Sequence, residues 1–178
     1  AAVAVDAEGA VSLTETTTGG LPTVNAFHRA LAAGLVFKVS DSGNHWQVAT
    51  GVESTRYRVS GDVSVVFDTR GHAIISYMAF DKLGTYNYWG HNSSRNGLYV
   101  RRSLDGGKTW EENDVPVIAH DSIEQNPPWE DKPYIVSDTT QSKYAGNLYI
   151  GWTRWTLQDS EILLTRLHRR RRDLVEAD

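Results

Sequence analysis

The chain has 178 residues, of which 40% are hydrophobic and 22% are charged, so its length and composition are those of a globular domain with a sizeable core. Its net charge of -4 argues against a nucleic-acid binder that works by neutralising phosphates, and no apolar run approaches the roughly 20 residues of a membrane-spanning helix. The absence of cysteine excludes disulfides, a thiolate nucleophile and a cysteine-based zinc site.

The first predicted strand, at residues 3–9, belongs to a pattern that returns twice. Val-Ala-Val-Asp-Ala-Glu-Gly at 3–9 is matched by Val-Val-Phe-Asp-Thr-Arg-Gly at 65–71, and Tyr-Ile-Val-Ser-Asp at 134–138 begins a third copy. A second, unrelated motif ends in Trp46 and recurs 64 residues later, ending in Trp110. Two motifs that recur in the same order indicate an internal repeat, with units at about 1–60, 61–125 and 126–167.

One stretch of the first unit competes with this β pattern. Residues 24–35 carry Phe27, Ala30, Leu31 and Gly34 at helical spacing. A short helix and an irregular connection are equally compatible with that sequence.

The second unit contains four predicted strands. Residues 63–68 alternate between apolar and polar types, residues 74–80 are rich in strand formers, and residues 69–72 between them carry a turn signal. Residues 98–103 predict the third strand, and the run toward residues 117–118 predicts the fourth. Four short antiparallel strands in a unit of this length are typical of one β-propeller blade.

The third unit stops early, because only residues 148–152 and 162–167 follow its first strand with the expected pattern. The sequence therefore predicts an all-β fold, a partial β-propeller of about two and a half four-stranded antiparallel blades over residues 1–167. Closed propellers use four to eight blades, so the remaining blades are expected as partners in a longer chain. The first residue is Ala1 and the only methionine is Met78, which predicts a processed product or a fragment.

Residues 168–178 form a basic tail that contains Arg169–Arg172. Such a run can bind an anionic surface or a nucleic acid. A solvated chain end is the interpretation that we favour, and we predict no nucleic-acid partner.

The segment 103–110, Ser-Leu-Asp-Gly-Gly-Lys-Thr-Trp, fits the Asp-box pattern Ser-x-Asp-x-Gly-x-Thr-Trp. Asp105 can accept backbone N–H bonds across the turn, and Gly107 can adopt a positive φ. The hydroxyls of Ser103 and Thr109 can tie the loop ends together, while Trp110 covers the hairpin with an apolar ring. These residue types predict a structural hairpin and make Asp105 a poor candidate for catalysis.

With this motif the chain resembles the sialidase-like superfamily of Asp-box (BNR-repeat) propellers. A degenerate second Asp-box, with Asp41, Gly43 and Trp46, supports the resemblance, as do segments 61–81 and 130–135. The resemblance implies that these hairpins lie away from the active face, and that glycan substrates bind at the opposite end of the blades, around the central axis. It also implies a secreted or periplasmic protein.

Strand order places five polar residues on that opposite end. Asp62, Asp81 and Asp131 are candidates for acid/base catalysis or polar substrate contacts, and Glu130 and Arg154 are candidates for substrate binding. The alternative is that these carboxylates cap turns or pair with a neighbouring lysine. The resemblance implies an arginine cluster, a tyrosine nucleophile assisted by a glutamate, and an aspartate acid/base. The Arg-Ile-Pro motif that announces the first arginine is absent, so no catalytic residue is carried over.

The loop at 81–97 is rich in aromatic residues. Tyr86, Tyr88 and Trp89 offer flat rings among Asn and Ser donors, which suits the stacking of a sugar, and long loops on rigid scaffolds often carry function. Packing over a neighbouring blade is the alternative for the same side chains.

Two functions remain open on this sequence. The first is a glycoside hydrolase of the exo-α-sialidase type, or a fragment of one; the alternative is a non-catalytic propeller that binds glycan or protein at the same end. We predict a glycan or glycoconjugate as partner. We predict no metal and no cofactor, because the histidines are scattered and phosphate-loop motifs are absent; a cation site at His120, Asp121 and Glu124 is a weaker alternative.

Overall fold

In the computed structural model, the described part of the chain consists of residues 2–5, 11–17, 34–40, 45–49, 54, 56–57, 59–81, 95–122 and 127–167. The basic tail at 168–178 and residues 24–33, where a helix was an alternative, lie outside it. Gly34 and Leu35 begin a strand.

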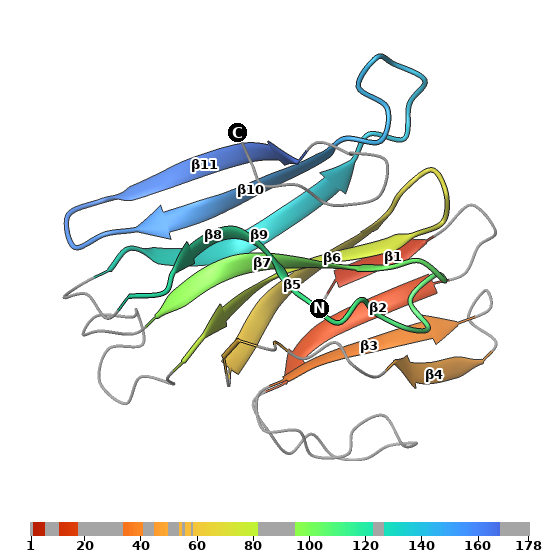
Figure 1. Ribbon diagram of the computed structural model, residues 1–178, viewed down its shortest axis with the longest axis horizontal. Coiled ribbons are helices and arrows are strands. Elements are labelled where there is room, and N and C mark those ends of the chain that lie inside the picture. The colour runs from red at the N-terminus through yellow and green to blue at the C-terminus, as the bar shows by residue number, and fades with distance from the viewer. Residues whose placement is uncertain are drawn as a thin grey trace.

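Eleven described strands form three antiparallel sheets in chain order (Figure 1). The first sheet contains β1 (Ala2–Val5), β2 (Val11–Thr17), β3 (Gly34–Ser40) and β4 (Trp46–Ala49). The second contains β5 (Val59–Phe67), β6 (Ala73–Phe80), β7 (Asn96–Ser103) and β8 (Val115–His120). The third contains β9 (Trp129–Ser137), β10 (Leu148–Trp155) and β11 (Ser160–Leu167). Each sheet is a meander in which consecutive strands pair, so the prediction of a partial β-propeller is confirmed.

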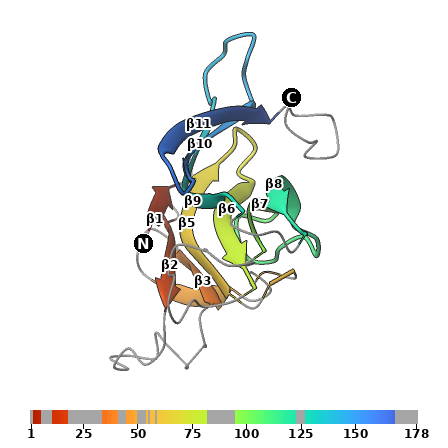
Figure 2. The same cartoon turned by 90° about the vertical axis from the view of Figure 1, so that its left-hand side faces the viewer.

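The second sheet lies between the other two. Strand β5 contacts β1, β2 and β3 of the first sheet and β9 of the third, while β6 and β7 also contact β9 (Figure 2). A sheet that is covered on both faces needs apolar residues at consecutive positions rather than at alternate ones. Strand β6, with the sequence Ala-Ile-Ile-Ser-Tyr-Met-Ala-Phe, is accordingly buried along almost its whole length.

Two apolar clusters lie on opposite faces of the second sheet. On the face toward the third sheet, Leu98 and Val100 of β7 pack with Ile135 and Ile150. On the opposite face, a cluster built around Tyr77 and Tyr99 also contains Val65, Phe67, Ala73, Ile75 and Ala79. Alternation of side chains along β7 explains the split, since Leu98 and Tyr99 must point to opposite faces.

The strand directions give the second sheet two distinct ends. The β5–β6 turn at residues 68–72 and the β7–β8 hairpin at residues 103–110 lie together at one end, which we call the hairpin end; there a Cβ on Gly106 would lie 3.9 Å from the carbonyl oxygen of Gly71. At the other end, which we call the open end, β5 and β7 begin and β6 and β8 finish. The third sheet has the same directions, so β9 begins and β10 finishes at its open end.

Candidate functional site

The inner strands of the second and third sheets carry matching β-bulges near the open end. The register between β5 and β6 shifts between Gly61 and Ser64, and that between β9 and β10 shifts between Gly151 and Thr153. The bulges contain the two described non-glycine residues with positive φ, Asp62 at 45° and Lys132 at 52°. A bulge redirects side chains, and such conformations are costly for residues with a Cβ, so they concentrate at functional positions.

The two bulges bring Asp62 and Asp131 together. Their side chains share a hydrogen bond, and Lys132 Nζ lies 3.1 Å from Asp131 Oδ2 and 3.9 Å from Asp62 Oδ2. Trp155 Nε1 donates to Asp131 Oδ2 over 3.1 Å. The Asp131 side chain is only 4% exposed, whereas that of Asp62 is 43% exposed, so Asp62 is the more accessible member.

The environment of this pair raises the pKa of the Asp62 carboxyl. Burial raises the pKa of the Asp62 carboxyl, and the hydrogen bond and negative charge of Asp131 raise it further, against the lowering effect of Lys132. The negative charge of Asp131 thus favours the protonated form of Asp62. Such a pair can deliver or accept a proton at the open end.

Glu130, the neighbour of Asp131, joins the second and third sheets. Its side chain is fully buried, and Oε1 accepts from His120 Nε2 and Arg154 Nε, both at 2.8 Å. Its Oε2 accepts from Trp152 Nε1 at 2.6 Å. Burial alone would raise the pKa of Glu130, but the hydrogen bonds from His120, Trp152 and Arg154 outweigh it and hold the pKa below the usual range. Glu130 therefore stays ionised and orients the groups around it.

Asn96 completes this connection at the backbone. Its side-chain oxygen accepts from the backbone N–H of Glu130 at 3.1 Å, and its side-chain nitrogen donates to the carbonyl oxygen of Pro128 at 3.0 Å. The sequence interpretation assigned no role to Asn96 or Trp152, and it considered His120 only as a member of a cation site with Asp121 and Glu124. Asn96, the first residue of β7, pairs with His120, the last residue of β8, and this register places the two residues side by side.

Asp81 belongs to a different group. Arg95 Nε donates to Asp81 Oδ2 at 3.1 Å, and the Arg95 guanidinium lies over the ring of Tyr57, 5.7 Å from its centroid. The Tyr57 hydroxyl donates to Asp121 Oδ1 at 2.5 Å. Asp81 is thus held within a cluster of cationic and aromatic side chains, whereas Asp62 and Asp131 contact each other.

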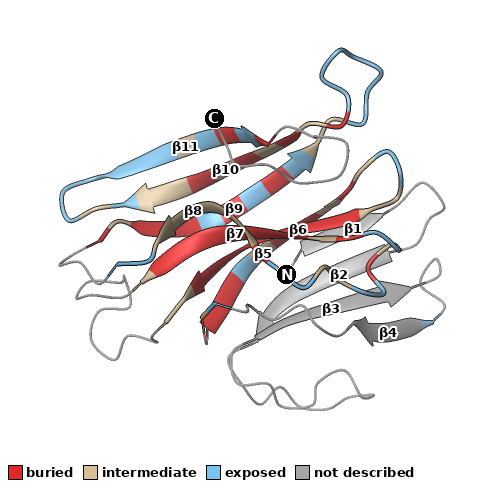
Figure 3. Ribbon diagram, in the orientation of Figure 1, coloured by how far each residue is buried: buried red, intermediate tan, exposed pale blue. Residues whose placement is uncertain are grey.

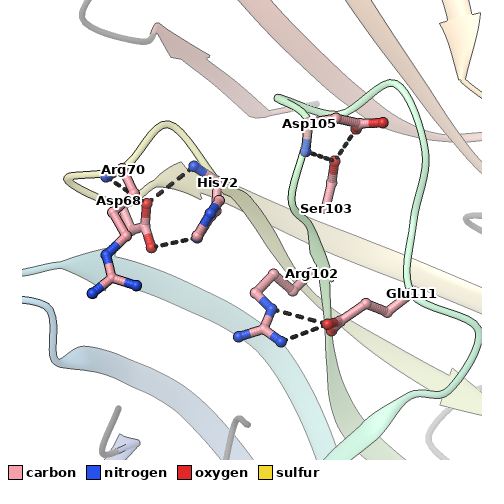
Figure 4. Close-up of polar contacts among 7 residues, drawn as sticks. All are labelled: Asp68, Arg70, His72, Arg102, Ser103, Asp105 and Glu111. Atoms are coloured by element: carbon pink, nitrogen blue, oxygen red, sulfur yellow. Dashed lines mark hydrogen bonds and ion pairs between the residues drawn. The ribbon is translucent and has the colours of Figure 1, made fainter. Parts of the chain in front are cut away.

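At the hairpin end, the Asp105 side chain bonds to its own loop (Figure 4). Its Oδ1 accepts from Ser103 Oγ at 2.7 Å and from the backbone N–H groups of Lys108 and Thr109, and its Oδ2 accepts from Thr109 Oγ1 at 2.6 Å. Gly107 has a φ of 94°, as expected for the position. Partial burial would raise the pKa of Asp105, but the bonds from Thr109, Ser103 and Lys108 lower it to about 2.

The neighbouring turn uses the same device. Asp68 Oδ1 accepts from the backbone N–H groups of Arg70 and His72, at 2.8 and 3.0 Å, and its Oδ2 lies 3.0 Å from His72 Nδ1 (Figure 4). Arg102 pairs with Glu111 at the foot of the β7–β8 hairpin. At this end Asp68 and Asp105 thus accept hydrogen bonds from their own turns, whereas at the open end two carboxyl groups interact with each other.

Several candidates lie outside the described residues, namely Tyr86, Tyr88 and Trp89 of the aromatic loop, Asp41 and Gly43 of the degenerate Asp-box, and Glu124. Trp46 begins β4. In the described ranges, no group of three or more His, Asp or Glu side chains could hold a metal ion. The described residues contain no helix that is long and apolar enough to cross a membrane.

Comparison with known proteins identifies the fold. No family model matches the sequence, and no curated protein matches it. Similar solved structures include a protein of unknown function from Dyadobacter fermentans, with 17% identity and a TM-score of 0.58, and an endo-arabinase from Bacteroides thetaiotaomicron, with 16% identity and a TM-score of 0.52. Both similarities cover 93% of this chain but only 50% and 54% of those chains, so it spans about half their length. At these identities the likeness concerns the fold alone.

Proposed function

We propose that this chain is part of a carbohydrate-active propeller that binds glycans at the open end of its blades and hydrolyses a glycosidic bond there. The observation that carries the proposal is the Asp62–Asp131 pair, because hydrolysis needs a proton donor and the contact with Asp131 raises the pKa of Asp62. An endo-arabinase among the structural neighbours and the Asp-box resemblance both support a glycan as substrate. The resemblance favours a sialidase-type enzyme and a secreted or periplasmic location.

The spacing of the pair limits its role. Glycosidases that use two carboxylates separate them by about 5 Å or by about 6.5–9.5 Å, according to stereochemistry. Asp62 and Asp131 instead interact directly with each other and share Lys132, so they do not stand on opposite sides of a bound substrate. We therefore assign them a single function as acid/base, with Asp62 as the exposed donor and Asp131 as the group that tunes it. The nucleophile or base would come from another residue.

Two cations flank the pair and suit an anionic sugar. Lys132 contacts both carboxylates, and the Arg154 guanidinium, held through Nε by Glu130, has a side chain that is 24% exposed. A guanidinium fixed at Nε can still offer its terminal N–H groups to a ligand carboxylate. These contacts support Arg154 as a substrate-binding residue.

The test is turnover of a panel of fluorogenic glycosides, with sialosides and arabinosides included, by this chain and by the complete product of its gene. We expect Asp62→Asn to reduce kcat by at least about 100-fold, the usual contribution of a general acid. In the unmodified protein, the rate should fall as the pH rises through the raised pKa of Asp62. Asp81→Asn is the matched control and should retain activity. Equal losses in both variants would contradict the assignment.

A non-catalytic glycan-binding protein is the second candidate, and the state of Glu130 favours it. The most buried carboxylate of the open end is fully engaged with three donors and is not available as a nucleophile or base. Under this alternative no glycoside is hydrolysed, whereas glycan binding measured by calorimetry persists in Asp62→Asn and weakens in Arg154→Ala.

A further inference from the structure

The outer face of the third sheet, which points away from the second sheet, exposes large apolar side chains. Ile162 and Leu164 of β11 are 81% and 72% exposed, and Tyr134 and Val136 of β9 are 72% and 58% exposed. Figure 3 shows β11 as the most exposed of the described strands of the second and third sheets. Four such side chains gathered on one sheet face make a patch of the kind that marks an interaction surface.

The strand register shows which face of the second sheet is equivalent to this outer face of the third sheet. Ala73 pairs with both Phe67 and Ser103 in the second sheet, and Leu148 pairs with both Ser137 and Leu167 in the third. Ser103 of β7 is therefore equivalent to Leu167 of β11. Leu98 and Val100 precede Ser103 by the same number of residues as Ile162 and Leu164 precede Leu167, so they are the equivalent positions in the two strands. Along the inner strands, Ser64 and Val66 of β5 take the places of Tyr134 and Val136.

The corresponding face of the second sheet is covered. Leu98 and Val100 are fully buried in the cluster that packs against the third sheet, and Ser64 Oγ accepts the backbone N–H of Ile135 of β9 at 3.2 Å. Apolar residues therefore occupy these positions in both sheets, except that Ser64 stands where the third sheet has Tyr134, but in the third sheet nothing described lies over them. The repeat itself thus indicates that this face is built to receive a sheet.

We propose that a further antiparallel sheet of the same kind packs against the outer face of the third sheet, and that this sheet is formed by polypeptide outside these 178 residues. The solved structures that share this fold over 93% of the chain are about twice as long, which leaves room for such a sheet. The proposal does not depend on the proposed glycan chemistry.

The existing interface between the second and third sheets predicts the chemistry of the incoming sheet. There the third sheet offers indole rings and branched aliphatic side chains from all three of its described strands: Trp129, Ile135, Leu148, Ile150, Trp152 and Leu167. The incoming sheet should present a similar apolar face.

The chain contains no cysteine, so Ile162→Cys creates a single thiol whose accessibility can be measured. We expect a maleimide to label Ile162→Cys rapidly in the 178-residue chain and at least about tenfold more slowly in the complete translated product of the gene. Thr139→Cys, at an exposed position between β9 and β10, is the control and should react equally fast in both. Substitution at a position that is 81% exposed should leave folding intact, which circular dichroism checks.

Two results would overturn the proposal. Equally fast labelling of Ile162→Cys in both proteins, whatever the length of the complete product, would mean that no sheet covers the face. Protection that appears already in the 178-residue chain and rises with its concentration, together with a dimer in sedimentation, would identify a second copy as the occupant instead.

Discussion

Asp105 and Asp62 are both aspartates in turns or bulges of the second repeat, yet their surroundings move their pKa values in opposite directions. Asp105 accepts four hydrogen bonds from its own loop, which favour the ionised form. Asp62 faces a second carboxylate in a partly buried position, which favours the protonated form. The first arrangement stabilises a hairpin, and the second raises the pKa of an accessible carboxyl group at the open end.

Replacement of Asp105 by Ala should destabilise the protein by about 1–3 kcal/mol, because the hydroxyls and N–H groups that it satisfies lose their acceptor. The pKa of Asp105 is lowered to about 2, so its contribution is complete above the unfolded-state value near 3.9 and is lost as the pH falls toward 2. Urea midpoints at pH 7 and at low pH measure both effects. Lys108→Ala, which removes an exposed side chain of the same loop, is the control; if it is equally destabilising, the carboxylate is not what holds the hairpin.

Asp62→Asn should stabilise the protein near pH 7 by up to about 1 kcal/mol, a figure kept small because the side chain is 43% exposed. The pKa of Asp62 is raised, so its effect on stability becomes unfavourable as the pH rises above the unfolded-state value near 3.9. Asn also tolerates the positive φ at this position. Thermal unfolding should show the gain in stability at pH 7 and no gain near pH 3, where the side chain at this position is neutral in both the unmodified protein and the variant. A loss of stability at pH 7 would mean that Lys132 outweighs Asp131.

At the level of the strands, much of the architecture could be predicted from sequence. Alternation at residues 63–68 and strand formers at residues 74–80 located β5 and β6, since period-2 patterns report directly on a pleated sheet. The sequence predicted the first strand of the second unit over residues 63–68, but β5 begins at Val59, so Gly61 and Asp62 lie inside it. A bulge with positive φ at a non-glycine residue leaves no compositional signal, so the Asp62–Asp131 contact could not be deduced.

Contacts between sheets were equally beyond the sequence. Glu130 was a candidate because of its place at the start of an inner strand, but its partner His120 lies in another sheet and depends on how the two sheets pack. Asn96, which binds the backbone of Glu130 from 34 residues earlier in the chain, was missed for the same reason. Local patterns predict strands, whereas such pairings follow from their three-dimensional arrangement.

Glu130→Gln tests the connection between the second and third sheets. The amide removes the charge and places an NH2 group among the donors of His120, Trp152 and Arg154, so we expect a loss of about 3 kcal/mol at pH 7. Because the pKa of Glu130 is lowered, the difference from the unmodified protein should shrink as the pH falls below the unfolded-state value near 4.3. Denaturant unfolding, followed by Trp fluorescence, measures this difference in stability at each pH. Glu161→Gln, an exposed carboxylate on β11, should leave stability unchanged.

At the scale of the whole molecule, the three sheets are stacked so that the second has a neighbour on each face and the third has one described neighbour (Figure 2). In such an array, stability is approximately the sum of the sheets and of the interfaces between neighbours. The third sheet therefore depends on a single interface, centred on Leu98, Val100 and the side chains that cover them. Residues on the opposite face of the second sheet support a different interface.

Leu98→Ala and Ile75→Ala separate these two interfaces, because both residues are fully buried in the second sheet but belong to the clusters on opposite faces. Each truncation should cost about 2–5 kcal/mol through lost apolar contact and a residual cavity. Hydrogen exchange should show the difference: Leu98→Ala lowers the protection of β9, β10 and β11 first, because the third sheet loses its main contact, whereas Ile75→Ala leaves their protection closer to that of the unmodified protein. Equal loss of protection throughout both variants would show that the three sheets unfold as one cooperative unit, so that no interface can be weakened by itself.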